Sequence, residues 1–176
     1  RVSGKDTLKV CKNLTKLREI NSNEVNYCKF YDPKNDKIID PEALLLWFPG
    51  PNSYTGEDLA EFQVHGSNAV INSLLKALSE HDNCRLAEPG EFTKIAFQND
   101  KIDLLKAESI GDLIHAETEL QRDQAVKLVQ GNASNYYNDL RDKLIKSLSY
   151  IEAKIDFAED DLPEKVLKEA QNSIKE

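Results

Sequence analysis

The chain has 176 residues, of which 40% are hydrophobic and 31% charged, and its formal net charge is −8. This composition is typical of a globular protein and excludes a disordered chain. The longest strongly apolar run, residues 43–48, is far shorter than the ~20 residues of a membrane span. Nucleic-acid affinity depends on clustered Lys and Arg. We find no basic stripe with interleaved aromatic residues, so the chain is predicted to bind nucleic acid only weakly by itself.

The three cysteines, Cys11, Cys28 and Cys84, are far apart in the sequence and none forms a CxxC pair. We interpret them as reduced thiols and not as metal ligands or disulfide partners. The acidic run at residues 159–161 is interpreted as a solvated helix end. The sequence therefore predicts no metal site.

Two elements are predicted at the start of the chain. The opening Arg-Val-Ser-Gly lacks an initiator Met, and we interpret it as the remainder of a truncated strand, so that no targeting segment can be assigned. Apolar residues at helical spacing then predict a helix within residues 5–20.

Two strands are expected next. The first is Val25–Tyr31, followed by a turn at residues 32–36. The second is the apolar run Ala43–Phe48, which ends at a Pro-Gly-Pro segment and is predicted to be buried on both faces.

The segment Leu59–His65 alternates between apolar and polar residues, which is typical of a strand. Ala60, Phe62 and Val64 should face a core. The opposite face would then present Glu61, Gln63 and His65, which are a carboxylate, an amide and an imidazole.

The region after this strand is predicted to contain a capped helix, a short strand and a second helix. Ser67 or Asn68 is the expected N-cap of the first helix, which carries an amphipathic apolar stripe. Residues 85–87 are expected to form the short strand, and residues 91–98 the second helix. Strands and helices alternate without a regular βαβ repeat, so we assign this part to the α+β class.

From about Leu104 onward, the pattern is helical throughout, and we place a domain boundary near residue 100. Gly131 is the expected end of one helix, and Ser134 or Asn135 the expected N-cap of the next. That helix should continue to Ile155. A break at residues 162–163 and a further helix at residues 164–176 complete the prediction.

Several of these segments together resemble one protein family in order and spacing. They are residues 46–58 (LWFPGPNSYTGED), 61–66 (EFQVHG), 89–93 (PGEFT), 96–104 (AFQNDKIDL), 107–108, 112–119 (DLIHAETE) and 155–157. Over residues 1–161 the chain resembles the MnmE/TrmE family of tRNA-modification GTPases. The stretch 115–124 is most similar to the mitochondrial branch of that family.

The resemblance implies a fold and a set of partners. Residues 1–100 would form an aminomethyltransferase-like α+β domain that binds tetrahydrofolate and forms a homodimer, and residues 101–176 the start of an all-α helical domain. With a flavin-dependent MnmG-type partner, the parent protein would modify carbon 5 of the wobble uridine of tRNA, with the folate as the one-carbon source. A mitochondrial location is expected, and otherwise a cytoplasmic one.

The chain departs from the family pattern because it contains no GxxxxGK[ST] motif and lacks the family's C-terminal Cys motif. We therefore expect GTP, Mg²⁺ and K⁺ to bind only to a G domain that is absent here. Without that domain, the 176 residues are expected to have no activity of their own, and we assign no catalytic residue.

The family's folate contacts correspond to Arg1, Glu61 and Lys101 in this sequence, and the expected ligand is 5-formyl- or methylene-tetrahydrofolate. A carboxylate such as Glu61 can accept two hydrogen bonds from the adjacent N–H groups of a pterin ring. Arg1 and Lys101 could bind the anionic glutamate tail or the ring carbonyl.

Simpler interpretations stay open for these residues and for the domain. Glu61 and Lys101 could be ordinary surface charges, and His65 is more often a structural residue than a general base. The alternative function is dimerisation alone, with a folate site that does not work. A stand-alone folate-dependent transferase is disfavoured because no nucleophile–base pair is visible.

Overall fold

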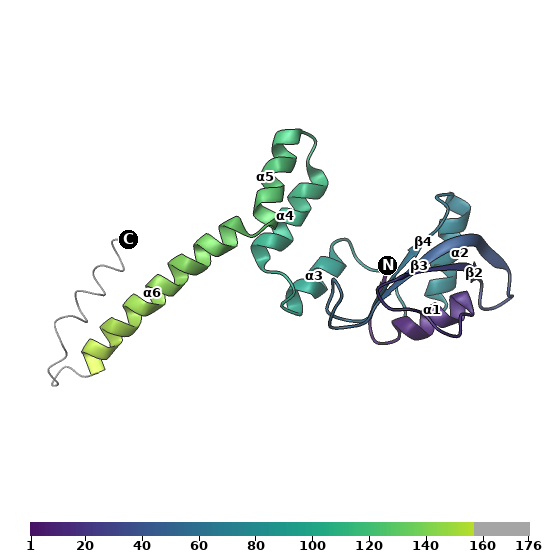
Figure 1. The fold of residues 1–176 in the computed structure, drawn as a ribbon, viewed down its shortest axis with the longest axis horizontal. Coiled ribbons are helices and arrows are strands. Elements are labelled where there is room, and N and C mark those ends of the chain that lie inside the picture. The colour runs from purple at the N-terminus through teal and green to yellow at the C-terminus, as the bar shows by residue number, and fades with distance from the viewer. Residues whose placement is uncertain (157–176) are drawn as a thin grey trace. The chain divides into compact units, whose positions relative to one another are not determined.

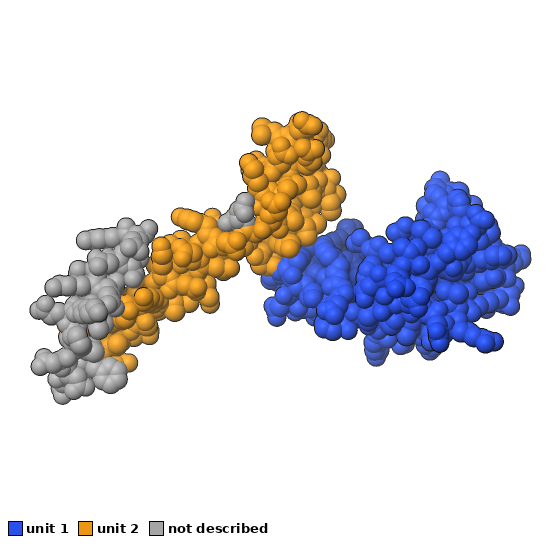
Figure 2. Space-filling view, in the orientation of Figure 1, with its two compact units in different colours: residues 1–102 blue, residues 103–176 orange. Residues whose placement is uncertain are grey.

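The computed structural model describes residues 1–156, except for the side chain of Asn132. The chain divides into two compact units, residues 1–102 and 103–176 (Figure 2). None of the helices in the described part is long and apolar enough to cross a membrane. The acidic run 159–161 and the predicted break and final helix after it lie outside the described residues.

Unit 1 is built on a four-stranded antiparallel sheet with the strand order β1-β4-β3-β2 (Figure 1). The strands are β1 (Val2–Ser3), β2 (Val25–Tyr31), β3 (Ile38–Phe48) and β4 (Leu59–Gln63). The predicted strand at Val25–Tyr31 is confirmed. The predicted apolar strand is the second half of β3, which starts five residues earlier.

Three helices accompany this sheet: α1 (Thr7–Thr15), α2 (Asn68–Ser79) and α3 (Glu91–Gln98). Cys11 of α1 packs in a core cluster with Phe30 and Leu45 of the sheet. Leu14 of α1 packs with Leu74 of α2 in a second cluster. Both helices therefore cover the same face of the sheet.

The helix boundaries of unit 1 follow from local signals. Ser67 caps α2 by accepting a hydrogen bond from the Val70 N–H at 3.2 Å, as predicted. The helix predicted at residues 91–98 is also confirmed. Helix α1 is shorter than the predicted range because Lys16 adopts a left-handed conformation, with φ of 58°, and closes the helix.

The alternation in β4 is confirmed, since Ala60 is fully buried and Phe62 and Val64 pack against the core. The prediction that residues 43–48 are buried on both faces is wrong. Both covering helices lie on one side, so Leu44 and Leu46 on the other side stay half-buried.

The short strand predicted at residues 85–87 does not form. The Arg85 guanidinium donates to the Glu91 carboxylate and to the Leu86 carbonyl. These contacts, in place of a ladder with a neighbouring strand, hold the segment, and Leu86 is 69% exposed.

The described part of unit 2 is helical, with α4 (Leu104–His115), α5 (Glu119–Val129) and α6 (Asn132–Asp156). Asp103 caps α4, and Thr118 forms a capping box with Gln121 at the start of α5. The prediction that Ser134 or Asn135 caps the last of these helices is wrong. Helix α6 begins at Asn132, directly after Gly131, whose carbonyl accepts the Asn135 N–H. Together the two units have the predicted α+β architecture followed by a helical segment.

Candidate ligand-binding site

An ion pair between Arg1 and Glu61 forms the centre of the candidate site. Val2 pairs with Ala60 in the β1–β4 ladder, which places Arg1 beside Glu61 on the same face of the sheet. The Arg1 Nε lies 2.8 Å from the Glu61 Oε1, and the side chains are 52% and 27% exposed. The structure thus brings two of the three predicted site residues into contact, at a place that solvent can reach.

The loop between β3 and β4, residues 49–58, is tied to β1 by polar contacts. The Ser3 Oγ lies 2.7 Å from the Thr55 Oγ1 and donates to the Glu57 Oε2 at 3.0 Å. The Tyr54 ring lies under the Arg1 guanidinium, with 5.9 Å from the guanidinium carbon to the ring centroid. These contacts fix the loop beside the Arg1–Glu61 pair.

Lys101, the third predicted residue, follows α3 and contacts the same loop. Its Nζ donates to the Pro51 carbonyl at 2.9 Å, and the neighbouring Asn99 donates to the Thr55 carbonyl at 2.7 Å. Gly56 has φ of +80°, and a Cβ there would lie 3.3 Å from the Lys101 Cγ and 3.2 Å from the Asn99 Cβ. The Lys101 side chain therefore passes close to Gly56, where the positive φ favours glycine and an added Cβ would press on Lys101.

No hydrogen bond or ion pair joins Lys101 to Arg1 or Glu61 within the described residues. The loop is what links the three predicted positions, since β1, the loop and the segment after α3 are bonded to one another through it. Sequence reasoning missed the residues that make these links, namely Ser3, Tyr54, Thr55 and Asn99. Gly56 was the available signal, because it marked the turn, but nothing local to it specifies partners about fifty residues away.

His65 is held by a buried carboxylate. The Asp40 side chain has no exposed surface and accepts hydrogen bonds from the His65 N–H at 2.8 Å and the Glu42 N–H at 3.1 Å. The His65 Nδ1 lies 2.9 Å from the Asp40 Oδ1. Burial acts to raise the pKa of Asp40, but these hydrogen bonds outweigh it, and the pKa lies below its usual value. The contacts support a structural role for His65, in which it ties the end of β4 to β3.

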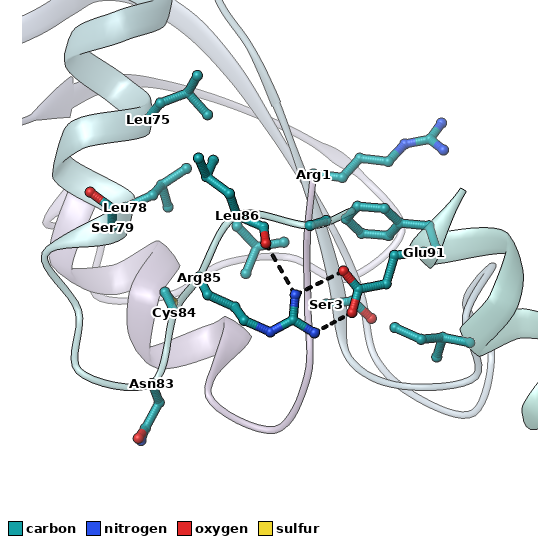
Figure 3. Close-up of a pocket in the computed structure, with 14 residues that line it drawn as sticks. Arg1, Ser3, Leu75, Leu78, Ser79, Asn83, Cys84, Arg85, Leu86 and Glu91 are labelled. Carbon is teal, nitrogen blue, oxygen red and sulfur yellow. Dashed lines mark hydrogen bonds and ion pairs between the residues drawn. The ribbon is translucent and has the colours of Figure 1, made fainter. Parts of the chain in front are cut away.

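Unit 1 also contains a cavity of about 420 Å³ between β1, α2 and the segment 83–95 (Figure 3). Its wall includes the Arg85–Glu91 ion pair, which lowers the pKa of Glu91 to about 2, chiefly through the hydrogen bonds from Arg85. Figure 3 shows the Arg1 side chain pointing away from this pair. Glu61 and Lys101 do not line the cavity. The cavity and the candidate site therefore meet at β1, where Arg1 and Ser3 line the cavity.

The donor set of the candidate site suits an organic ligand with both N–H groups and anionic groups. Glu61 supplies carboxylate oxygens that accept hydrogen bonds, while Arg1 and Lys101 supply cations. In the part of the chain that the structure describes, no cluster of three or more His, Cys, Asp or Glu side chains is arranged to hold a metal ion.

The chain is thus a two-part protein, with an α+β domain that carries a polar site at the edge of its sheet, followed by a helical segment. Residues 1–101 match the family model described as the GTP-binding protein TrmE N-terminus, and residues 104–176 match the MnmE helical domain. The chain therefore belongs to the MnmE/TrmE family of tRNA modification GTPases.

Individual relatives agree with this assignment. The tRNA modification GTPase MnmE of Pelagibacter ubique is 57% identical over 168 residues, which are 96% of this chain and 38% of the relative. MnmE of Rickettsia bellii is 44% identical over 175 residues, 99% of this chain and 39% of the relative. The mitochondrial tRNA modification GTPase gtpbp3 of Dictyostelium discoideum is 39% identical over 181 residues, 99% of this chain and 35% of the relative. The chain thus spans less than two fifths of the length of these relatives.

Proposed function

We propose that unit 1 binds a reduced folate, 5-formyl- or methylene-tetrahydrofolate, through Glu61, Arg1 and Lys101. The observation that carries the proposal is the Arg1–Glu61 pair, which places a carboxylate and a guanidinium 2.8 Å apart on an accessible sheet edge. The loop 49–58 joins this pair to Lys101. When bound, the folate supplies a one-carbon unit.

The three residues would bind different parts of the folate. In the proposal, Glu61 accepts N–H groups of the pterin edge, and the Arg1 guanidinium lies beside the same carboxylate. Arg1 and Lys101 balance the negative charge of the ligand's glutamate tail or bind the ring carbonyl. Arg1 contacts one Glu61 oxygen, and each carboxylate oxygen can accept two hydrogen bonds, so a ligand can take both oxygens while Arg1 stays in place.

Calorimetric titration with 5-formyltetrahydrofolate tests this proposal. We expect micromolar binding, and we expect Glu61→Ala to weaken it by ~2 kcal/mol, which is typical for the loss of a charge-assisted hydrogen bond. Gln63→Ala is the matched control, because Gln63 is exposed on the same strand and the same face. Equal affinity of the Glu61→Ala variant and the unmutated chain would overturn the role of Glu61. No binding by the folded, unmutated chain would overturn the folate proposal and favour the alternative of a dimerisation module.

Homodimerisation is the second part of the proposal, and the uncovered face of the sheet supports it. Val25 pairs with Leu46, and Tyr27 with Leu44, on the face opposite the two covering helices. Val25 and Tyr27 are 60% and 65% exposed. An antiparallel sheet that faces water is normally polar on that side, so the apolar patch of Val25, Tyr27, Leu44 and Leu46 fits a second copy of the chain. Leu46 pairs with Glu61 on the same face, so this patch lies next to the candidate site.

Sedimentation equilibrium tests the dimer and its surface. We expect the unmutated chain to be a dimer at tens of micromolar, and Tyr27→Asp to shift it toward monomer. The control is Leu86→Asp, which puts the same charge at an apolar residue of similar exposure, 69%, outside the sheet. A clean monomer for the unmutated chain would contradict dimerisation, while equal effects of both variants would contradict the choice of surface.

We infer the wider role from the family. The 176 residues would serve in a tRNA-modifying GTPase that acts on carbon 5 of the wobble uridine together with a flavin-dependent MnmG-type partner. In this division, residues 1–100 form the folate-binding and dimerisation domain, and residues 101–176 begin the helical domain. GTP, Mg²⁺ and K⁺ would bind outside these residues, because the sequence has no GxxxxGK[ST] motif.

We propose two locations for the protein, the mitochondrion and the bacterial cytoplasm. The mitochondrial location is supported by the relative from Dictyostelium discoideum, whose name includes it. The cytoplasmic location is supported by the higher identity to the Pelagibacter ubique protein, 57% against 39%. The genome that encodes the chain decides between them.

A further inference from the structure

Helix α1 carries lysines along one side. Lys9 and Lys12 lie within the helix, Lys5 lies in the turn before it, and Lys16 closes it. The three-residue step from Lys9 to Lys12 places these two side chains on one face of the helix, and Lys5 and Lys16 flank its two ends. All four lysines are exposed, whereas the opposite side of α1 buries Val10, Cys11 and Leu14 against the sheet and α2. We call Lys5, Lys9, Lys12 and Lys16 the lysine stripe.

The stripe is an unusual concentration of positive charge in this chain. Residues 1–18 contain six Lys or Arg and a single Asp, although the whole chain has a net charge of −8. Lys5, Lys9 and Lys12 form no ion pair with the described residues. Lys16 pairs with Asp36 at 2.9 Å and lies 4.2 Å from the centroid of the Tyr31 ring. Three adjacent ammonium groups are thus left free for an anionic partner.

The position of the stripe narrows the choice of that partner. A helix that binds a membrane surface inserts its apolar side into the lipid, but the apolar side of α1 is already buried in the core. A polyanion that contacts only the charged side does not need that apolar face. Repeated, flexible point charges are typical of contacts to the phosphate backbone of a nucleic acid.

We propose that the lysine stripe of α1 contacts the phosphate backbone of tRNA. This inference rests on the proposed role in tRNA modification, and it assigns one surface of unit 1 to that RNA. It also revises the expectation of weak binding, which was drawn from the net charge and from the lack of a basic stripe with aromatic residues. Lys9 and Lys12 share a face of the helix, Lys5 and Lys16 flank its ends, and Tyr31 lies beside Lys16.

Fluorescence anisotropy with a labelled tRNA transcript, measured at several salt concentrations, tests the proposal on the full 176-residue chain. The variant is the triple substitution Lys5→Gln, Lys9→Gln and Lys12→Gln, since Gln and Lys have similar helix propensity. Each phosphate contact contributes about 0.7 to 0.9 to the slope of log K against log salt. We expect the slope to become shallower by about 2 to 3, and the affinity at ~100 mM salt to fall at least about tenfold.

The control triple substitution is Lys37→Gln, Lys76→Gln and Lys127→Gln, which removes the same charge from exposed lysines outside α1. We expect it to leave the slope nearly unchanged, and circular dichroism checks that both variants fold. Equal slopes for the two triple variants would overturn the proposal, as would the absence of tRNA binding by the unmutated chain. Stripe-dependent binding to phosphatidylserine vesicles without binding to tRNA would overturn it in favour of a membrane. The folate titration is independent of all these outcomes, so a failure here leaves that proposal standing.

Discussion

The two units differ in how they bury their apolar residues. Unit 1 packs helices and strands around fully buried side chains such as Leu14, Phe30 and Leu45. In the described part of unit 2, the residues with the least exposure are small, namely Ser109, Ala125 and Ser147. Large apolar side chains of α6 stay in water, for example Leu144 at 57% and Ile155 at 69%. Unit 1 should therefore supply most of the free energy of unfolding, while unit 2 depends on local helix signals.

Truncation of one large apolar side chain in each unit should give the largest difference in the free energy of unfolding. Phe30 is fully buried and its ring lies 5.3 Å from that of Phe62. Phe30→Ala should lower the free energy of unfolding by about 3 to 5 kcal/mol, and Leu144→Ala by less than about 1 kcal/mol. Urea unfolding followed by the fluorescence of Trp47, the only tryptophan, measures the effect in unit 1, and hydrogen exchange of the α6 amides measures the effect in unit 2. Similar losses in the two variants would contradict the comparison.

The buried carboxylate of unit 1 should give the next largest effect. Asp40→Asn replaces an acceptor oxygen with an amide that faces N–H donors, so we expect a loss of about 2 kcal/mol. The pKa of Asp40 is lowered in the folded state. Its contribution should therefore be complete above the unfolded pKa, about 4, and be lost as the pH falls through the folded pKa.

Urea unfolding at a series of pH values checks this prediction, with the exposed Asp82→Asn as the control. The difference between the unmutated chain and Asp40→Asn should shrink as the solution becomes acidic. If the difference in the free energy of unfolding does not depend on pH, the charge of Asp40 does not contribute to stability.

Two glycines of unit 1 separate the cost of a backbone conformation from an effect on the site. Gly56 and Gly90 have φ of +80° and +78°, but only at Gly56 would a Cβ meet neighbours, which are Lys101 and Asn99. Each substitution by Ala should cost about 1 to 2 kcal/mol of stability. Gly56→Ala alone should also weaken the binding of 5-formyltetrahydrofolate, because it displaces Lys101. Equal affinities of the two variants in calorimetry would count against a role for Lys101.

The smallest expected effect lies in unit 2. Thr118 forms both halves of a capping box with Gln121, with the Gln121 N–H to Thr118 Oγ1 distance at 3.3 Å. Thr118→Ala should destabilise α5 by about 1 kcal/mol, and Thr118→Ser should restore most of it. Hydrogen exchange of the first amides of α5 measures the effect. Unchanged exchange in Thr118→Ala would show that packing, and not the cap, holds the start of this helix.

Local patterns in the sequence predicted much of unit 1, and the failures have physical causes. β2, α3 and the Ser67 cap depend on alternation, helical spacing and a side-chain hydrogen bond, all of which are encoded within a few residues. The strand expected at residues 85–87 failed because the pattern gives no information on whether a ladder partner exists. The double burial of residues 43–48 failed because the sequence does not say which faces are covered.

In the candidate site too, some features were predicted from the sequence and others depend on contacts between distant residues. The family motif selected Arg1 and Glu61, and the structure explains their pairing by the register of β1 against β4. The contacts of Ser3 and Thr55 span 52 residues and follow from the folded loop, so local reasoning could not find them. The four lysines of the stripe could be read from the sequence. The prediction of weak nucleic-acid binding did not use them, because it relied on the net charge and on the lack of aromatic residues between basic ones.

The three cysteines of unit 1 are buried to different extents, so their rates of chemical modification report local opening at different places. Burial raises the pKa of Cys11 to about 12 and that of Cys28 to about 11, so both thiols stay protonated and out of reach of an alkylating reagent while the unit is closed. Cys84 is only partly buried. Modification of Cys84 would therefore record fluctuations at the cavity rim, whereas modification of Cys11 would record the rare moments when α1 leaves the sheet.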